Sequence, residues 1–248
     1  MRGRSLAASV ALALLLTAAP ADAGTVRHVH SSSRYDRSPD ALHRQVLRLT
    51  AHAGIATWTE VDAPSRARAL RVPGWRVFGA ESAVSWRLER WRRVHAQRDR
   101  ITPETWAVSV ILEDRRTGER LAVSVVHMPA HVEYGDRFRV NRQADVWRAA
   151  VAGQRRLNRA LEARWRPVAR IVAGDWNVDL RRPSWRLRLA RAFPRLEVTW
   201  HRPLPAAGTH RGRRLIDATF STAYGRARLE PDDASSDHRP YRERLAWP

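Results

Sequence analysis

Short apolar runs alternate with amphipathic segments along this chain, a pattern that predicts strands interleaved with helices. Apolar residues at helical spacing predict helices over Pro39–Ala53, Pro64–Leu70, Arg142–Trp165 and Trp185–Phe193. The runs that predict strands are Val26–His30, Ile55–Thr59, Trp75–Phe78, Ala83–Trp86, Trp91–Ala96, Trp106–Leu112, Leu121–His127, Ile171–Ala173, Glu197–Trp200 and Leu215–Ser221. Two hairpins are expected, 83–86 with 91–96 and 106–112 with 121–127. Hairpins followed by helices predict two sheets packed face to face with helices outside, an α/β fold.

The first 23 residues have the pattern of a secretory signal peptide. Arg2 and Arg4 precede an apolar stretch, Leu6–Ala19, and Ala21-Asp22-Ala23 forms a small-x-small cleavage signal. A membrane span needs about 20 apolar residues, so cleavage is favoured over the alternative, an uncleaved anchor. We therefore expect a secreted, monomeric mature chain of residues 24–248, without membrane insertion. That length suits one large domain, and because the chain has no cysteine its stability must come from packing.

The chain is strongly basic, with a formal net charge of +20. All 45 of its basic residues are arginine. Such a field attracts polyanions, and arginines commonly neutralise phosphates. Codon usage would explain arginine over lysine, but it would not explain the excess over acids. The charge modestly favours a nucleic-acid partner, and adhesion to an acidic cell envelope is the alternative.

The segment Gly174-Asp175-Trp176-Asn177 follows the apolar run Ile171–Ala173, and it is the most informative stretch of the chain. Side chains alternate along extended backbone, so Asp175 and Asn177 face one side and Trp176 faces the other. An acid and an amide would then share one site. The alternative is a polar strand end that caps a turn through its own backbone.

Other acids and imidazoles also stand at the ends of apolar runs. In chain order they are Glu60, His127, Asp217 and the pair Asp237-His238 of Ser235-Ser236-Asp237-His238. Together with Gly-Asp-x-Asn, this ordered set resembles the endonuclease/exonuclease/phosphatase superfamily, whose folds are similar to pancreatic deoxyribonuclease. The resemblance extends from about Val26 to the end of the chain. It implies that residues 24–248 form a catalytic domain, a four-layer α/β sandwich of two packed, mostly antiparallel sheets flanked by helices.

The resemblance also implies a role for each motif residue in phosphoester hydrolysis, which needs a cation, an aligned water, a proton acceptor and stabilisation of the leaving group. Metal ligands are expected at Glu60, Asp237 and His28, for Mg²⁺ or Mn²⁺. The residues expected to be catalytic are His127, Asp175, Asn177, Asp217 and His238. Asp175 would act on the water, Asn177 would hold a phosphoryl oxygen, His127 and His238 would contact the phosphate, and Asp217 would orient His238.

Three positions leave alternatives open. His28 stands where the family usually carries asparagine, and imidazole is a poor Mg²⁺ ligand, so both metal preference and activity depend on it. His131 competes with His127 for the same role. Trp58 and Trp176 lie beside candidate residues, where an indole could line the pocket or stack on a base.

The function that the sequence favours is a secreted, divalent-metal-dependent phosphoesterase that cleaves nucleic acid. Two alternatives remain at this stage. One is a phospholipid or small phosphate-ester hydrolase of the same fold, and the other is a catalytically weak polyanion-binding protein.

Overall fold

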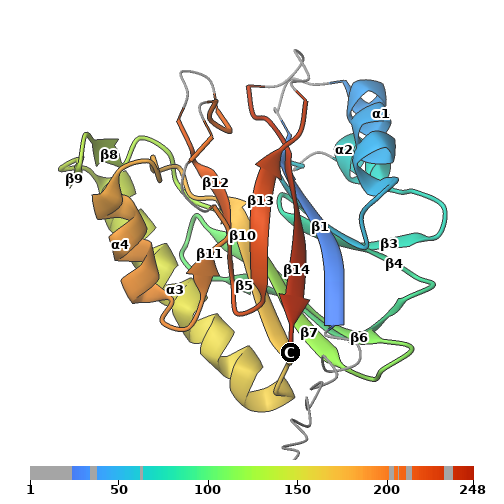
Figure 1. Cartoon of the computed structure of the whole chain (residues 1–248). Helices are drawn as coiled ribbons and strands as arrows, with labels where there is room; N and C mark the ends of the chain where they lie inside the picture. The colour runs from blue at the N-terminus through green and yellow to red at the C-terminus, as the bar shows by residue number, and fades with distance from the viewer. Residues whose placement is uncertain are drawn as a thin grey trace, which may run out of the picture.

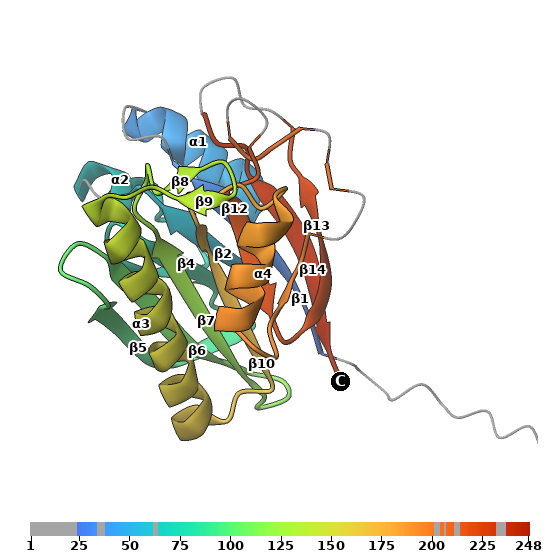
Figure 2. The ribbon, with the colours of Figure 1, turned by 90° about the vertical axis from the view of Figure 1, so that its left-hand side faces the viewer.

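The computed structural model describes residues 24–33, 38–61, 64–200, 204–205, 207–210, 214–231 and 237–248. Two six-stranded sheets pack face to face, and helices cover the outer side of each, as Figure 1 and Figure 2 show. The four-layer α/β sandwich expected from the sequence is confirmed. The predicted signal peptide, residues 1–23, lies outside the described residues, as do Ser235 and Ser236.

Each sheet joins strands that are far apart along the chain. The first sheet has the order β13 (Tyr224–Leu229), β14 (Tyr241–Trp247), β1 (Gly24–Ser32), β2 (Ile55–Thr59), β4 (Ala83–Arg87), β3 (Trp75–Gly79). The second has the order β11 (Glu197–Val198), β12 (Asp217–Ser221), β10 (Ala169–Asp175), β7 (Arg120–His127), β6 (Trp106–Asp114), β5 (Trp91–Arg100). A short ribbon pairs β8 (Glu133–Tyr134) with β9 (Arg137–Phe138). The β1–β2 and β7–β10 pairs are parallel and the other pairs are antiparallel, so the central strands of both sheets run together toward one rim.

The four helices are α1 (Pro39–Thr50), α2 (Pro64–Ala69), α3 (Arg142–Trp165) and α4 (Pro183–Ala192). Helix α1 begins at Ser38, whose Oγ accepts a hydrogen bond from the backbone N–H of Ala41 at 3.3 Å. Asn141 caps α3 in the same way, through the N–H of Ala144 at 2.8 Å. These caps satisfy helix N–H groups that have no partner within the helix, so the predicted helix starts are locally encoded.

Three layers of apolar side chains hold the sandwich together. Aliphatic residues of both sheets, among them Ile55, Val123 and Leu245, form a fully buried layer between the sheets. Helices α1 and α2 cover the first sheet, and α3 and α4 cover the second over an aromatic cluster that includes Trp147 and Trp185. Burying each large apolar side chain stabilises the fold by roughly 1.5–3 kcal/mol, so these layers form a rigid frame for residues at the rim.

The predicted hairpin of 83–86 with 91–96 is wrong. Strand β4 pairs with β2 and β3 in the first sheet, whereas β5 pairs with β6 in the second. Trp86 and Trp91 nevertheless pack into the same layer between the sheets. The burial pattern is therefore the same in either arrangement and does not reveal which partner a strand has.

The sequence pattern also missed β13 and β14, which form one edge of the first sheet. In both strands arginine alternates with inward residues, and in β13 two of these, Gly225 and Ala227, are small. An alternation with so little apolar contrast gives a weak strand signal. None of the helices in the described ranges is long and apolar enough to cross a membrane.

Candidate active site

Most of the predicted site residues stand at one rim of the sandwich. Glu60 follows β2, His127 ends β7, Asp175 ends β10, Asp217 begins β12, and His238 lies shortly before β14. Six of the eight predicted residues line one cavity of about 370 Å³: Glu60, His127, Asp175, Asn177, Asp237 and His238. Parallel central strands in both sheets bring these distant positions together, because the strand ends meet at the same edge.

Asp217 forms a buried pair with His238, which lines this cavity. The Nδ1 atom of His238 lies 2.9 Å from Oδ2 of Asp217, and both side chains are almost fully buried. Burial opposes the charge on His238, but the adjacent Asp217 carboxylate outweighs it and raises the pKa of His238 to about 10. The same contact holds the pKa of Asp217 well below its usual range, against the effect of burial. His238 is therefore a cation at neutral pH, with its second nitrogen directed toward Asp175.

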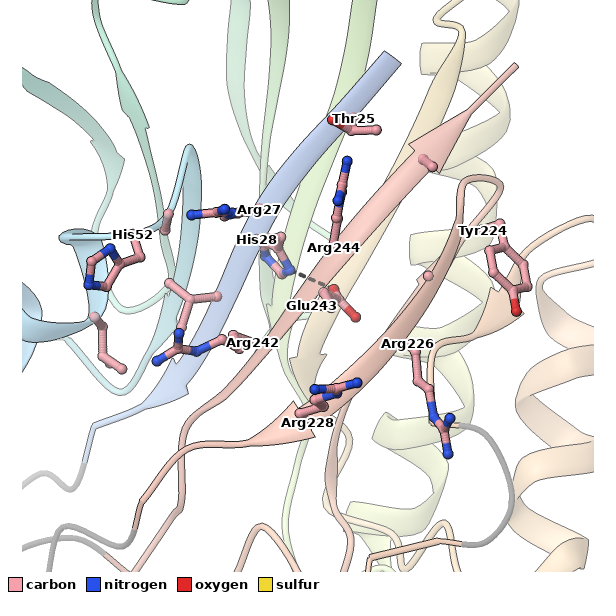
Figure 3. Close-up of a pocket in the computed structure, with 15 residues that line it drawn as sticks. Thr25, Arg27, His28, His52, Tyr224, Arg226, Arg228, Arg242, Glu243 and Arg244 are labelled. Atoms are coloured by element: carbon pink, nitrogen blue, oxygen red, sulfur yellow. Dashed lines mark hydrogen bonds and ion pairs between the residues drawn. The ribbon is translucent and has the colours of Figure 1, made fainter. Parts of the chain in front are cut away.

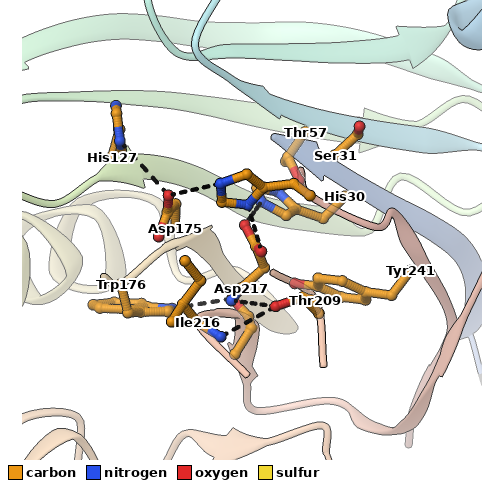
Figure 4. Close-up of polar contacts among 12 residues, drawn as sticks. His30, Ser31, Thr57, His127, Asp175, Trp176, Thr209, Ile216, Asp217 and Tyr241 are labelled. Carbon is orange, nitrogen blue, oxygen red and sulfur yellow. Dashed lines mark hydrogen bonds and ion pairs between the residues drawn. The ribbon is translucent and has the colours of Figure 1, made fainter. Parts of the chain in front are cut away.

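Asp175 contacts two imidazoles of the site, and Figure 4 shows its side chain directed toward His127. Its Oδ2 lies 3.8 Å from Nε2 of His238 and 3.7 Å from Nε2 of His127, and its Oδ1 accepts the backbone N–H of Asn177 at 2.9 Å. Burial, with a contribution from the charge of Asp217, raises the pKa of Asp175 to about 7. A carboxylate with such a pKa can take up or release a proton near neutral pH.

Asn177 has a left-handed backbone conformation, with φ of 54°. Asparagine tolerates this region better than most residues, and the turn here directs its side chain back to the rim. Its Nδ2 donates to the backbone carbonyl of Met128 at 2.7 Å, which leaves the amide fixed at the cavity wall.

His127 faces three carboxylates across the cavity. Its Nδ1 lies 3.2 Å from Oε1 of Glu81, and its Nε2 lies 3.9 Å from Oε1 of Glu60 and 3.7 Å from Asp175. Burial lowers the pKa of His127, but the hydrogen bond to Glu81 and the charges of Asp175 and Glu60 prevail and raise it to about 9. His127 thus provides a second positive charge. His131 is not among the residues that line the cavity.

The acidic residues of the rim fit a hard cation. Burial raises the pKa of Glu60; the charges of His127 and His238 lower it, and those of Asp217 and Asp237 raise it to a smaller extent. Oδ1 of Asp237 is buried without a hydrogen-bond partner among the described residues. Two groups there could hold a metal ion, Asp175 with Asp217 and His238, and His210 with Asp237 and His238. Carboxylate oxygens are the ligands that Mg²⁺ and Mn²⁺ prefer, so a divalent cation would satisfy the unpartnered oxygen and offset the repulsion.

The arrangement of strands and site can be compared with known proteins. No family model matches this sequence, and no curated protein matches it. The crystal structure of an endonuclease/exonuclease/phosphatase from Bacteroides vulgatus, 14% identical, superposes with a TM-score of 0.69 over 91% of this chain and 100% of that chain. This protein has the endonuclease/exonuclease/phosphatase fold.

Two further structures with this fold are named for different substrates or ligands. The mannosyl-6-phosphatase Bt3783 of Bacteroides thetaiotaomicron, 14% identical, has a TM-score of 0.67 over 90% of this chain and 100% of its own. D. rerio TDP2, 13% identical and complexed with a single-strand DNA product, has a TM-score of 0.66 over 89% of this chain and 98% of its own. The endonuclease/exonuclease/phosphatase fold predicted from the ordered motifs is thus confirmed.

His28 was predicted to be a metal ligand, but in the structure it lies away from the rim. The His28 side chain is fully buried between Glu243, whose Oε1 lies 2.6 Å from Nδ1, and Thr57, whose Oγ1 lies 2.9 Å from Nε2. Both ring nitrogens are therefore occupied. His28 lies well before the end of β1, whereas the rim is reached only near the end of that strand, so its position does not support a role as a metal ligand.

The next residue on the same face of β1, His30, contacts the site instead. Its Nε2 lies 3.5 Å from Oδ1 of Asp217, its Nδ1 lies 2.9 Å from Oγ1 of Thr57, and its ring packs 5.4 Å from that of Tyr241. Burial lowers the pKa of His30, and the hydrogen bond to Asp217 only partly offsets this. Asp217 therefore lies between two imidazoles, one charged and one that burial keeps neutral. Strand alternation from His28 could have identified this position.

Three other residues near the site gave no signal in the sequence. Glu81 in the β3–β4 turn pairs with His127, and His210 packs its ring 4.8 Å from that of His238. The hydroxyl of Thr209 accepts the backbone N–H groups of Ile216 and Asp217, at 3.1 and 3.0 Å. All three lie in turns or loops without periodicity, so only the fold shows that they belong to the site.

The two candidate tryptophans lie away from the cavity. Trp58 and Trp176 are both fully buried in helix–sheet packing, and their Nε1 atoms donate to Ser85 Oγ at 3.0 Å and to the Ala218 carbonyl at 3.1 Å. Neither indole is therefore available to stack on a substrate. Both belong to the apolar core beneath the helices.

Proposed function

We propose that this protein is a secreted, divalent-metal-dependent phosphoesterase that hydrolyses phosphodiester bonds in nucleic acid. The observation that carries the proposal is the position of Asp175. Its carboxylate, with a pKa near 7, lies between two imidazoles that carry positive charge at neutral pH, His127 and His238. Positive charge on both sides of a proton acceptor suits a phosphate, whose oxygens become more negative as a water attacks.

The carboxylates of Glu60 and Asp237 would hold the cation at the mouth of the cavity. A bound Mg²⁺ or Mn²⁺ ion supplies charge stabilisation at a phosphoryl oxygen. The other residues fulfil the roles that hydrolysis needs from the protein. Asp175 orients the attacking water and accepts its proton, and Asn177 holds a phosphoryl oxygen with its side-chain amide.

His238 donates a hydrogen bond from Nε2 to the phosphate while Asp217 holds Nδ1. This pairing sets the direction of the ring and keeps it charged. His127 donates to the phosphate or the leaving oxygen from the opposite wall. An acceptor and two donors on separate residues support in-line displacement as the mechanism.

Nucleic acid is the substrate that the charge favours. A chain with a net charge of +20 attracts a polyanion over a long range, whereas a small ester gains little from charges far from the cavity. The D. rerio structure, which holds a single-strand DNA product, supports this choice. Export rests on the leader sequence alone.

A sugar phosphate is the second candidate. The cavity of about 370 Å³ falls within the range of small-molecule sites, and the Bacteroides phosphatase with the same fold is named for mannosyl-6-phosphate chemistry. A phosphomonoester would occupy the same donors and acceptor.

The experiment that tests the proposal is a plasmid-nicking assay with purified residues 24–248 in Mg²⁺ or Mn²⁺. Nicking should stop on chelation with EDTA, and both Asp175→Asn and His238→Ala should reduce turnover by at least about a hundredfold while folding is retained. Activity undiminished in EDTA would contradict the metal dependence. If DNA stays intact while a sugar phosphate is hydrolysed, the substrate assignment is wrong and the reaction class stands.

A further inference from the structure

The outer face of the first sheet carries a second basic feature, away from the catalytic rim. A hollow of about 810 Å³ lies over β1, β14 and β13, and the end of α1 with His52 forms one of its walls. Five exposed arginines line it: Arg27, Arg226, Arg228, Arg242 and Arg244. Figure 3 shows these side chains gathered over the three strands. We call this feature the arginine groove.

Strand register places the arginines in rows. Arg27, Arg244 and Arg226 are direct neighbours across the three strands, and Arg242 and Arg228 are neighbours in the next row. Paired residues in an antiparallel sheet have Cα atoms about 4.5–5.5 Å apart, and successive outward residues lie about 7 Å apart along a strand. The groove therefore has a regular grid of guanidinium groups.

The fold itself gains little from this grid, because like charges opposite one another destabilise a sheet. Of these five arginines, Arg242 is the one that forms an ion pair among the described residues, with Glu230. Among the described residues, no carboxylate lies within ion-pairing distance of Arg27, Arg226, Arg228 or Arg244. Four positive charges in one hollow, without an ion-pair partner in the part of the chain that the structure describes, are complementary to a chain of phosphates.

We propose that the arginine groove is a binding site for single-stranded nucleic acid. The hollow is concave, so a flexible strand can reach its floor, whereas the flat surface of a bilayer would meet only its walls. Tyr224, at the start of β13, is 73% exposed beside the arginines, where its ring offers a surface for stacking a base. Basic grooves flanked by aromatic rings are the usual way in which proteins bind single strands.

This inference goes beyond the proposed function, because the groove residues contact none of the candidate catalytic groups and binding here requires no hydrolysis. The groove lies on the outer face of the first sheet, whereas the rim lies at the ends of strands. A strand held in the groove would keep nucleic acid near the enzyme between cleavage events.

The test measures binding of a labelled oligodeoxythymidine by fluorescence anisotropy in EDTA, so that the probe is not cleaved. The combined variant Arg226→Gln, Arg228→Gln, Arg244→Gln should raise Kd by at least about tenfold. It should also reduce the slope of log K against log salt by about 2, since each phosphate contact contributes about 0.7. A matched control on α3, with Arg156→Gln, Arg159→Gln and Arg164→Gln, loses the same charge from exposed positions and should change Kd by less than about twofold.

Two further measurements keep the proposal falsifiable. Tyr224→Ala should raise Kd by at least about fivefold, the effect of losing one stacked base. Hydrolysis of bis(p-nitrophenyl) phosphate, which is too small to reach the groove, should be the same for the groove variant and the parent. Failure of the proposed function would appear as no hydrolysis in metal while binding in EDTA persists.

Equal weakening by the groove and control variants would overturn the proposal, because binding would then reflect diffuse surface charge. Unchanged oligonucleotide binding in the groove variant would also overturn it. If that variant instead loses binding to phosphatidylserine vesicles, the groove is a membrane contact and not a nucleic-acid site.

Discussion

His238 and Asp217 come from separate segments of the chain, yet Nδ1 of His238 lies 2.9 Å from Oδ2 of Asp217 at the candidate active site. The pair keeps a buried imidazole protonated, with a pKa of about 10. His127 has a pKa raised to about 9, and the carboxyl of Asp175, which lies between the two imidazoles, has a pKa raised to about 7. The pH behaviour of the protein should therefore report on individual site residues.

Replacing Asp217 should change the pH profile as well as the rate. In Asp217→Asn the charge that raises the pKa of His238 is gone, so this pKa should fall toward the ordinary histidine value of about 6.5. Wild-type kcat/KM should hold into the alkaline range until the two donors deprotonate, His127 near pH 9 and His238 near pH 10. The variant should lose activity above about pH 7 and be slower by about a thousandfold at pH 8. An unchanged alkaline limb in a folded variant would show that Asp217 does not control His238.

Asp175→Asn should affect activity and stability in opposite directions. Because the pKa of Asp175 is about 7 when folded, wild-type activity should fall as the pH drops through 7, where the proton acceptor is lost. The raised pKa also means that ionising Asp175 opposes folding, a cost that develops as the pH rises from about 4 through 7. The variant cannot ionise at this position, so this cost is absent. In EDTA at pH 8 its melting temperature should exceed that of the wild type by about 2–4 °C for each kcal/mol of that cost. Calorimetry at pH 8 and pH 4 checks this, because the difference in melting temperature between wild type and variant should be smaller at pH 4.

His30 should act as a positioning residue through Asp217. His30→Gln removes the imidazole that lies 3.5 Å from Oδ1 of Asp217, and glutamine retains hydrogen-bonding groups for Thr57. We expect kcat to fall by about tenfold, the typical effect of losing one polar contact to a charged group, with KM little changed. The alkaline limb should also shift, because the pairing of Asp217 with His238 is altered. His43→Gln, at a histidine that bonds the Ala69 carbonyl away from the site, is the control and should leave both unchanged.

His28→Asn should reduce stability and leave metal preference unaltered. The substitution breaks the buried contact between His28 and Glu243 and leaves a carboxylate without its partner, which typically costs about 3–5 kcal/mol. Urea denaturation should show this loss, while the ratio of Mg²⁺ to Mn²⁺ activity stays at the wild-type value. A shift toward Mg²⁺ with unchanged stability would instead place His28 among the metal ligands.

Local chemistry in the sequence was sufficient for the elements and for part of the site. Helix starts can be read from the sequence, because Ser38 caps α1 and Asn141 caps α3. The periodic apolar residues within each helix then give its extent to within a few positions. Asp175 and Asn177 share one side of a strand exit because alternation is a property of the backbone alone. The ordered motifs then indicated the endonuclease/exonuclease/phosphatase fold, which the superpositions confirm.

Long-range pairing decided the rest. Trp86 and Trp91 have the same buried environment, but only the fold shows that their strands belong to different sheets. His28 and His30 lie on one face of one strand, and which of them reaches the rim depends on how far β1 extends beside its neighbours. The arginine groove arises in the same way, since Arg27 and Arg226 become neighbours of Arg244 only when β14 pairs with β1 on one side and with β13 on the other. Sequence periodicity determines which side of a strand a residue occupies, whereas the register between strands determines what it faces, and register is set by the whole core.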